Sequence, residues 1–317
     1  MSRILFSLQN RNKKLLTLFF LLLLLPIQNS YASRNGTTDK SNNFAVYVTY
    51  DMGGEKLSCS GALISPSIVV TAAHCVNNND GQYGSNYEVS IPGQSINLPI
   101  DYSKPVPKVL EIYIAPTYSN LGNSETDDVA FLRFDIPIST KSKIRIATEL
   151  EIKDIDLSTR VFAYGFGAVY ESGFAPPLYS QKYEFDWKFA KFDLSKSNTL
   201  LLNSSTTSAC LGDSGGPITT KLKSGEEVLI GIVNGAAVLE NSCGGKAVDG
   251  FFHTRAILLP KFFDLISNSL TQDLKNLEFE QIIANIGKKT RILCVKGKTK
   301  KYVSGIKPKC PIGFKKV

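Results

Sequence analysis

Short apolar and β-branched runs alternate with Gly, Asn, Ser and Pro turns from residue 44 to residue 270, and this pattern limits the fold more than any other feature. Such spacing is typical of strands in an all-β sandwich or a pair of barrels. The clearest runs are Phe44–Tyr50, Ala62–Ile64, Ile68–Thr71, Val109–Ile114, Val129–Phe134, Arg160–Tyr164, Leu229–Val233 and Gly250–Thr254. Convincing helical spacing comes late, at Pro260–Leu270 and Gln272–Ile286. We therefore expect an all-β body followed by a C-terminal helix.

Residues 1–32 have the layout of a signal peptide. Basic residues lead into the apolar run Leu15–Leu25, which is followed by Pro26 and the small-x-small triplet Ser30, Tyr31 and Ala32. A helix of that run spans only about 16 Å, whereas the hydrocarbon core of a bilayer is about 30 Å thick. A signal peptide cleaved after Ala32 is therefore favoured over the alternative, an uncleaved anchor. Export predicts a secreted, extracellular protein in an oxidising compartment.

The net charge of +8 is unevenly distributed along the chain. Residues 1–32 hold four bases, residues 288–317 hold eleven, and neither segment holds an acid. Residues 33–287 therefore carry 21 bases and 28 acids. A nucleic-acid-binding domain would spread Lys and Arg over its folded surface, so we expect no nucleic-acid partner. Any contact with an anionic cell-envelope surface is expected in the basic tail, whose alternative role is solubility.

Six cysteines in an exported chain predict three disulfides, and spacing alone leaves fifteen connectivities open. They are Cys59, Cys75, Cys210, Cys243, Cys294 and Cys310. A metal site is disfavoured because the only histidines are His74 and His253 and no CxxC pair occurs.

The most specific motif is Gly212–Pro217 (GDSGGP), which follows Cys210 closely. A serine hydroxyl becomes a nucleophile when a base removes its proton and backbone N–H groups face the developing oxyanion. Glycines allow the tight turn in which such N–H groups converge. The alternative is a Gly/Ser/Pro turn between two strands.

A base and a supporting acid occur upstream of this motif. His74 lies in the sequence TAAHC at the end of the run Ile68–Thr71, and imidazole exchanges protons near neutral pH. Its alternative is a hydrogen-bonded core histidine. Asp128 directly precedes a hydrophobic run and is the candidate for a buried acid that orients the imidazole. The alternative is a turn in which Asp127 and Asp128 are both solvated.

The order His74, Asp128, Ser214, with TAAHC, DVA and GDSGGP around these residues, resembles the chymotrypsin (trypsin-type) serine protease family over roughly residues 33–270. Cys59–Ile64 (CSGALI) resembles the family's CGGSLI strand, and Tyr164–Gly167 (YGFG) resembles its GWG segment.

The resemblance implies two antiparallel β-barrels, about residues 33–150 and 151–271, with the active site between them and a C-terminal helix after the second. Residues 272–317 would then form a helical linker and a short basic tail with a disulfide loop. The family's disulfides imply the pairs Cys59–Cys75 and Cys210–Cys243, which leaves Cys294–Cys310 as an additional pair in the tail.

The resemblance also implies a serine endopeptidase that acts on protein or peptide substrates through an acyl-enzyme, with no cofactor and no metal. Ser214 would attack the carbonyl, His74 would act as the base, and Asp128 would orient it. The N–H groups of Gly212 and Ser214 would form the oxyanion hole. The other function class is a protease-fold binding or adhesion protein that has lost activity. No sequence pattern indicates an oligomeric state.

The residues at the expected specificity pocket depart from the family. Ser208 stands six residues before Ser214, where trypsin-like members carry an aspartate, and the family's Ser-Trp-Gly becomes Asn234-Gly235-Ala236. Gly250 is a further wall residue, with its alignment ambiguous by one position. We expect an uncharged pocket for aromatic or aliphatic side chains, unless another wall residue decides the preference.

The expected amino terminus departs from the family as well. Ser33-Arg34-Asn35-Gly36 stands at the separation from Cys59 at which the family has Ile-Val-Asn-Gly. Our hypothesis is that signal peptidase itself creates the amino group that inserts beside Asp213. The alternative is an Asp213 without this partner.

Overall fold

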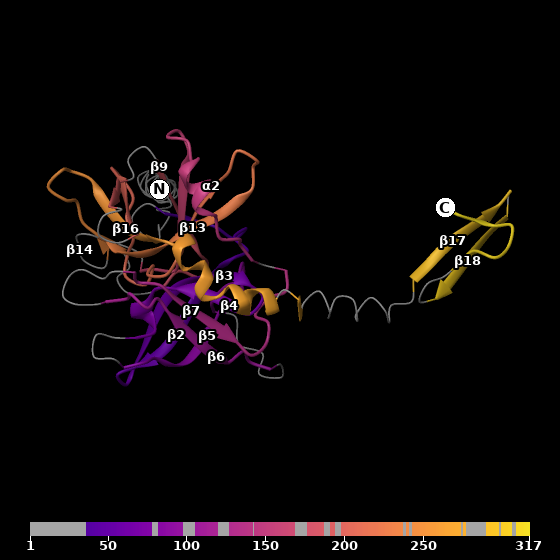
Figure 1. The fold of residues 1–317 in the computed structure, drawn as a ribbon, viewed down its shortest axis with the longest axis horizontal. Helices are drawn as coiled ribbons and strands as arrows, with labels where there is room; N and C mark the ends of the chain where they lie inside the picture. The colour runs from indigo at the N-terminus through magenta and orange to yellow at the C-terminus, as the bar shows by residue number, and fades with distance from the viewer. Residues whose placement is uncertain are drawn as a thin grey trace, which may run out of the picture. The chain divides into compact units, whose positions relative to one another are not determined.

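The computed structural model describes residues 36–77, 82–97, 105–119, 127–141, 143–168, 176–186, 191–193, 198–236, 239–240, 243–273, 275–276, 290–297, 299–305 and 309–317. The predicted signal peptide, Ser33 and most of the expected Gln272–Ile286 helix lie outside these residues. Two large antiparallel sheets account for most of the described strands (Figure 1). The prediction of an all-β fold is confirmed.

The first sheet has six strands in the order β5-β2-β3-β4-β7-β6. Their bounds are β2 Ala45–Met52, β3 Glu55–Ser65, β4 Ile68–Thr71, β5 Ser85–Val89, β6 Val109–Ile114 and β7 Ala130–Phe134. Strands β4 and β7 pair directly, with Thr71 opposite Ala130. Because His74 follows β4 and Asp128 precedes β7, this pairing brings the two residues to the same end of the sheet.

The second sheet has eight strands in the order β1-β9-β8-β12-β13-β16-β11-β10. Their bounds are β1 Thr37–Thr38, β8 Arg160–Gly165, β9 Gln181–Asp186, β10 Lys191–Asp193, β11 Thr199–Ser204, β12 Pro217–Lys221, β13 Glu227–Ala236 and β16 Phe252–Leu258. Strand β1 pairs with β9, so the first described strand of the chain belongs to this second sheet. Two short strands, β14 Leu239–Glu240 and β15 Cys243–Gly244, pair separately.

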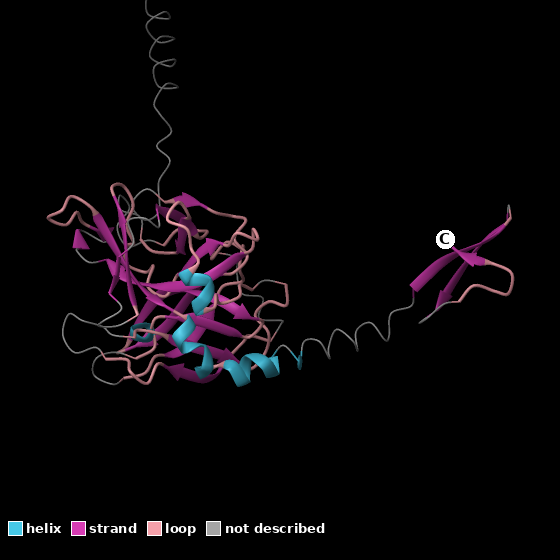
Figure 2. Cartoon of the chain, turned by 45° about the horizontal axis from the view of Figure 1, so that its top comes forward, coloured by secondary structure: helices cyan, strands magenta, loops and turns pink. Residues whose placement is uncertain are grey.

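Both sheets curl around an apolar interior, as the two-barrel expectation requires (Figures 1 and 2). The first core extends into the second half of the chain, where Tyr164 and Phe166 contact residues of the first sheet. The Phe44 and Tyr164 rings meet edge-on at 5.3 Å, and Tyr47 lies 5.7 Å from Phe166. These aromatic contacts join the two barrels near the end of β8.

Helices are few and short among the described residues. Strand β4 leads into the 3-10 turn η1 Ala73–Cys75, and the α-helix α2 Glu149–Lys153 begins at a capping box made by Thr148 and Glu151. The expected Pro260–Leu270 helix begins as the 3-10 helix η3 Pro260–Leu265, and α-helical geometry occupies 267–273. No helix in the described ranges is long and apolar enough to span a bilayer.

The carboxylate of Asp273 fixes the end of that helical segment to the β3–β4 hairpin. It accepts hydrogen bonds from the Ser65 and Ser67 hydroxyls, both at 2.5 Å, and from the Ser67 N–H at 3.2 Å. The helix is therefore held to the first barrel although it follows the second in the sequence.

The tail forms a three-stranded antiparallel sheet in the order β18-β17-β19. Strand β17 spans Thr290–Lys296, β18 spans Thr299–Gly305 and β19 spans Lys315–Lys316. Cys294 is fully buried and bonded to Cys310, so the disulfide lies at the centre of this small sheet. The sequence predicted the disulfide loop but not these strands.

Candidate active site

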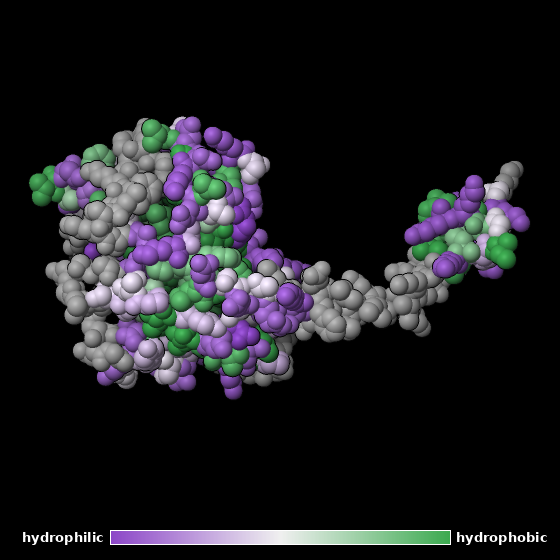
Figure 3. All heavy atoms as spheres, in the orientation of Figure 1, coloured by the Kyte–Doolittle hydropathy of each residue, from purple (hydrophilic) through white to green (hydrophobic). Residues whose placement is uncertain are grey.

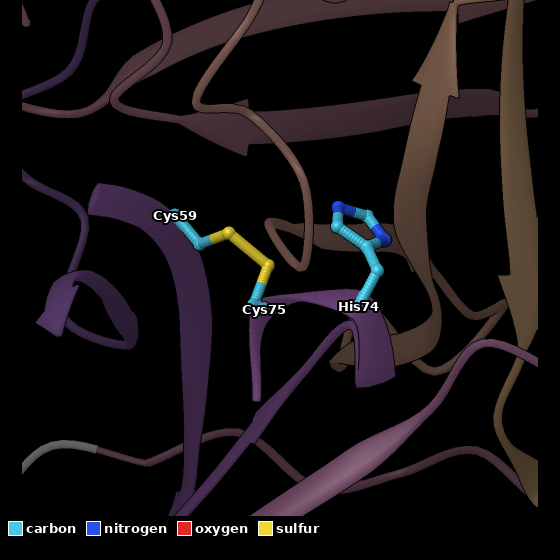
Figure 4. Close-up of side chains that lie close together, drawn as sticks. All are labelled: Cys59, His74 and Cys75. Carbon is cyan, nitrogen blue, oxygen red and sulfur yellow. A yellow bond between two sulfur atoms is a disulfide. The ribbon is translucent and has the colours of Figure 1, made fainter. Parts of the chain in front are cut away.

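His74 lies in the turn η1, which is joined covalently to β3. The adjacent Cys75 is bonded to Cys59, with a Cα–Cα separation of 6.3 Å. In Figure 4 the imidazole ring of His74 lies beside this disulfide. The histidine is therefore presented from a turn whose backbone is fixed by a β-strand on one side and a disulfide on the other.

His74, Cys59 and Cys75 are close enough in space to suggest a metal site, but their chemistry does not fit one. The ligand atoms of the three residues lie within 4.8 Å of one another. Both sulfurs are joined in the disulfide and offer no thiolate, and the ring Nδ1 of His74 faces Asp128. This cluster is therefore a histidine beside a structural disulfide.

Asp128 binds His74 through both carboxylate oxygens. Oδ2 lies 2.7 Å from His74 Nδ1, and Oδ1 accepts the backbone N–H of His74 at 2.8 Å. The carboxylate is fully buried, whereas the His74 side chain is 24% exposed. This arrangement orients the ring so that its Nδ1 faces the acid.

A third contact to Asp128 comes from the second barrel. The side-chain amide of Asn234 in β13 donates to Asp128 Oδ2 at 2.7 Å. Burial alone raises the pKa of Asp128, but the charge of His74 and the hydrogen bonds from His74 and Asn234 outweigh burial and hold this pKa below its usual value. The carboxylate is therefore kept ionised while fully buried.

Asp127 fixes the backbone that presents Asp128. It is a non-glycine residue at a φ of 49°, in the left-handed region that is costly for most side chains. Its carboxylate accepts hydrogen bonds from Thr117, from Asn198 at 3.2 Å and from Lys261 at 3.3 Å. These contacts come from three separate segments and stabilise the turn.

The Gly212–Pro217 segment turns sharply against both barrels. Gly212 has a φ of 95°, a conformation that side-chain-bearing residues rarely adopt. At Gly216 a Cβ atom would lie 2.1 Å from the Tyr164 carbonyl oxygen, so only glycine fits there. The glycines of the motif thus permit a backbone path that other residues would block.

Most backbone N–H groups in this segment have protein acceptors. The bonds are Asp213 N–H to Cys210 at 3.1 Å, Gly215 N–H to Val233 at 2.7 Å and Gly216 N–H to Asp213 at 2.9 Å. For Gly212 and Ser214, no acceptor occurs within the described ranges. Two N–H groups of one tight turn are therefore available to an external acceptor.

Asn234 connects Ser214 with the histidine–aspartate pair. The Ser214 hydroxyl donates to the Asn234 carbonyl oxygen at 3.4 Å, while the Asn234 side chain donates to Asp128. Gly215 packs closely on the chain before His74, because a Cβ there would lie 2.7 Å from the Ala72 nitrogen. The structure thus brings the three sequence-predicted residues to one place at the barrel interface.

Asp213 is completely buried beside Ser214. Its Oδ1 accepts the Gly167 N–H and its Oδ2 accepts the Cys210 N–H, both at 2.8 Å. Burial raises the pKa of Asp213 to about 6, although hydrogen bonds from Cys210, Tyr183 and Gly167 oppose the shift. Its expected partner, the amino group of Ser33, lies outside the described residues.

The four residues expected in the specificity pocket separate into three places. Ser208 and Ala236 both pack against Gly244, where a Cβ atom would lie 2.1 Å from Ser208 Oγ and 3.1 Å from Ala236 Cβ. Asn234 instead directs its side chain to Asp128. Gly250 lies in an exposed turn with a φ of 82°. Of the four, only Ser208 and Ala236 come together.

The Cys210–Cys243 disulfide closes this region, since β15 begins at Cys243 and the Gly244 N–H donates to the Ala209 carbonyl at 3.0 Å. Together with Cys59–Cys75 and Cys294–Cys310, it completes the set of pairs that the resemblance implied.

Sequence reasoning missed two hydrogen bonds, one from the Asn234 side chain to Asp128 and one from the Ser60 hydroxyl to the backbone of Gly212. Ser60 stands where the family's CGGSLI strand has glycine, and that departure was the available signal. Its hydroxyl donates to the Gly212 carbonyl oxygen at 2.8 Å.

Comparisons with known proteins point to one family. The family model Trypsin matches residues 33–257. The chain is 28% identical over 204 residues to ovochymase from Halocynthia roretzi, across 61% of this chain and 12% of that protein. It is 27% identical over 202 residues to serine protease SP24D from Anopheles gambiae, across 62% of this chain and 68% of the relative. It is 26% identical over 188 residues to chymotrypsin-C from Rattus norvegicus, across 56% of this chain and 67% of the relative.

Proposed function

This chain belongs to the trypsin family of chymotrypsin-like serine proteases, and on that premise we propose that it is an active, secreted endopeptidase whose nucleophile is Ser214. The observation that carries the proposal is the buried Asp128 carboxylate, 2.7 Å from His74 Nδ1, at the barrel interface where the GDSGGP turn lies. The homologous proteases at 26–28% identity support a serine-type peptidase of the same class.

In the proposed mechanism His74 takes the proton of Ser214 as the oxygen attacks the scissile carbonyl, and returns it to the leaving amine. Asp128 holds the Nδ1–H tautomer and stabilises the imidazolium that forms. Water then hydrolyses the acyl-enzyme by the same proton path in reverse.

The oxyanion of each tetrahedral intermediate is assigned to the N–H groups of Gly212 and Ser214. Their lack of an acceptor within the described residues supports this role. Removing one such donor in a related mechanism lowers kcat by about 10²–10³. Because the donors are backbone groups, the contribution depends on the conformation of the turn and not on side chains.

The pocket is proposed to accept uncharged aromatic or aliphatic side chains. Ser208 is fully buried and its hydroxyl donates to the Ala209 carbonyl at 2.9 Å, so this position supplies no charge for Lys or Arg. A peptide library should show faster cleavage after Phe, Tyr or Leu than after Lys or Arg. The reverse order would refute this preference.

Activity is tested with purified protein secreted from a host, using peptide and casein substrates. The wild type should hydrolyse both, and Ser214→Ala should fold but hydrolyse neither. Ser224→Ala, which removes a hydroxyl from an exposed turn, is the matched control and should retain full activity. A folded wild type without turnover would instead favour the alternative function, a protease-fold binding or adhesion protein that has lost activity.

Export and activation are proposed to share one event, cleavage after Ala32. The new amino group of Ser33 would then pair with the buried Asp213 carboxylate. Mass spectrometry of the active secreted form should give Ser33 as the first residue. An active form that begins well after Ser33 would exclude this route.

We further propose that the tail sheet holds the enzyme near an anionic surface of the cell envelope. Its described lysines are all exposed, and residues 288–317 contain no acid. They are Lys296, Lys300, Lys301, Lys309, Lys315 and Lys316. Polar and apolar residues are mixed on the face of this sheet seen in Figure 3. Such a charge cluster attracts anionic surfaces, and salt weakens the attraction.

Deletion of residues 288–317 tests the role of the tail. The truncated enzyme should keep its turnover and lose association with cells at low salt. If cell association is unchanged at low salt, the tail does not act as an anchor.

A further inference from the structure

Ser60 joins the two barrels directly behind the Gly212–Pro217 turn. It lies in β3 of the first sheet and is fully buried. Its hydroxyl donates to the Gly212 carbonyl oxygen at 2.8 Å and accepts the Phe166 N–H at 2.9 Å. Its own N–H donates to the Ser214 carbonyl oxygen at 2.8 Å. One residue of the first barrel therefore contacts the backbone on both sides of Asp213.

Ser60 is itself fixed in place. Its carbonyl oxygen accepts the Thr71 hydroxyl at 2.8 Å, and Thr71 is the last residue of β4 before the turn that carries His74. The hydroxyl of Ser60 therefore makes its two hydrogen bonds from a strand that is paired on both sides, and the groups that it contacts cannot move away without breaking them.

The carbonyl of Gly212 is the group whose orientation matters most. Glycine has a wide choice of backbone torsions, and Gly212 adopts a φ of 95° that is reached easily from other conformations. The hydrogen bond from Ser60 restricts the peptide that follows Gly212, and this peptide leads directly to Asp213 and Ser214. The N–H groups of Gly212 and Ser214 flank the restrained peptide.

We infer that the hydroxyl of Ser60 is a positioning group for the oxyanion hole, acting from the first barrel on a turn of the second. It holds the Gly212 peptide so that the two free N–H groups converge on one point. The inference rests on the proposed function, because the oxyanion hole is part of the proposed mechanism.

A purely structural role would give a different result from a positioning role. Loss of packing or of the Phe166 contact lowers stability without a selective effect on the transition state. Loss of alignment in the oxyanion hole lowers kcat and leaves KM nearly unchanged, because the oxyanion exists only in the transition state and the tetrahedral intermediate. Loss of alignment also weakens the binding of a peptide boronic acid, because the boronate adduct with Ser214 places an oxygen in the oxyanion hole.

The test compares Ser60→Ala and Ser60→Gly with the wild type. Ser58→Ala is the matched control, because it removes a hydroxyl from the same strand two residues earlier. We expect kcat to fall about 10- to 100-fold in both Ser60 variants. This fall is smaller than, or close to, the fall caused by removing a whole oxyanion-hole donor. KM should stay within about twofold, boronate affinity should fall in step with kcat, and Ser58→Ala should match the wild type.

An unchanged kcat in folded Ser60 variants overturns the inference. So does a fall in kcat with undiminished boronate affinity, and so does failure of both variants to fold, since Ser60 would then serve the fold alone. A wild type that folds but neither turns over substrate nor forms the boronate adduct would instead overturn the proposed function.

Discussion

Replacement of Asn234 by leucine removes the one described contact between the second barrel and the Asp128 carboxylate. The lost hydrogen bond is 2.7 Å long, and its acceptor is fully buried and ionised. Hydrogen bonds to charged groups contribute about 1.5–3 kcal/mol, and leaving a buried charge underpaired places the cost toward the upper end. Asn234→Leu should therefore lower the free energy of unfolding by about 2–3 kcal/mol at neutral pH.

The same change should reduce catalysis. Asp128 orients His74 and stabilises the imidazolium in the proposed mechanism, and without the Asn234 hydrogen bond its carboxylate is held less firmly in that orientation. If half or more of the lost energy is felt in the transition state, kcat/KM falls about 5- to 150-fold, at 1.36 kcal/mol for each factor of ten.

Urea denaturation between pH 3 and 8 and steady-state kinetics measure both effects. The pKa of Asp128 is lowered in the folded protein, so its ionisation stabilises the fold above the unfolded pKa, and this stability is lost in acid. In Asn234→Leu the folded pKa of Asp128 is closer to the unfolded pKa, so the acid-dependent loss should be smaller and should be complete at a higher pH. Asn234→Asp is not a usable control because it adds a second acid, whereas Asn234→Ser restores a donor and should recover part of the activity. A kcat/KM of Asn234→Leu within twofold of the wild type would refute the reasoning.

Three further predictions concern other polar groups. Asp273→Ala should lower the free energy of unfolding by about 2–4 kcal/mol in urea, because three hydrogen bonds from Ser65 and Ser67 are lost, with kcat unchanged; an unchanged midpoint would contradict this. Ser208→Asp should raise cleavage after Lys and Arg relative to Phe and Leu at least about tenfold in a peptide library; a constant ratio would exclude this position from the pocket. Burial raises the pKa of Asp213 to about 6 in the folded protein, above the ordinary aspartate pKa of about 3.9, so the native state binds more protons between these values. Without a paired amino group, the wild type should lose about 2 kcal/mol of stability relative to Asp213→Asn as the pH rises from 4 to 6.5.

The strands could largely be predicted from local patterns. All eight expected runs coincide with or overlap strands. The Gly250 run begins two residues before β16, because Gly250 belongs to the bend that precedes this strand, and the Phe44 and Val129 runs begin one residue before β2 and β7. Strand β9 was missed although Tyr183 and Phe185 alternate with polar residues and are both buried. Strand β12 was not predicted because its first residue, Pro217, is typical of turns as well as of strand ends.

The tail strands could not be predicted in the same way. Lysine-rich segments with scattered apolar residues lack the alternation of a half-buried strand. In the structure β17 pairs on both sides, and the Cys294–Cys310 disulfide fills the place of a core. The stability of such a sheet comes from the covalent bond, which the two cysteines indicate, and from cross-strand pairing, which has no local sequence signature.

The candidate site, like the strands, could be predicted from the sequence only in part. His74, Asp128 and Ser214 stand in motifs that can be found by residue type and order. The side-chain contacts of Asn234 and Ser60 cannot, because each crosses from one barrel to the other and depends on how the two sheets meet. Asn234 was therefore expected on a pocket wall, and only the structure placed its amide on Asp128.

The central claim, that Ser214 is activated by His74 and Asp128, is tested most directly by covalent labelling with a fluorophosphonate. Intact mass and peptide mapping should give one adduct, on Ser214, in the wild type. Ser214→Ala should give none, and His74→Ala should react slower by at least about 10²-fold, in keeping with loss of the general base. An adduct on another residue, equal labelling of Ser214→Ala, or a folded wild type that does not react would contradict the account.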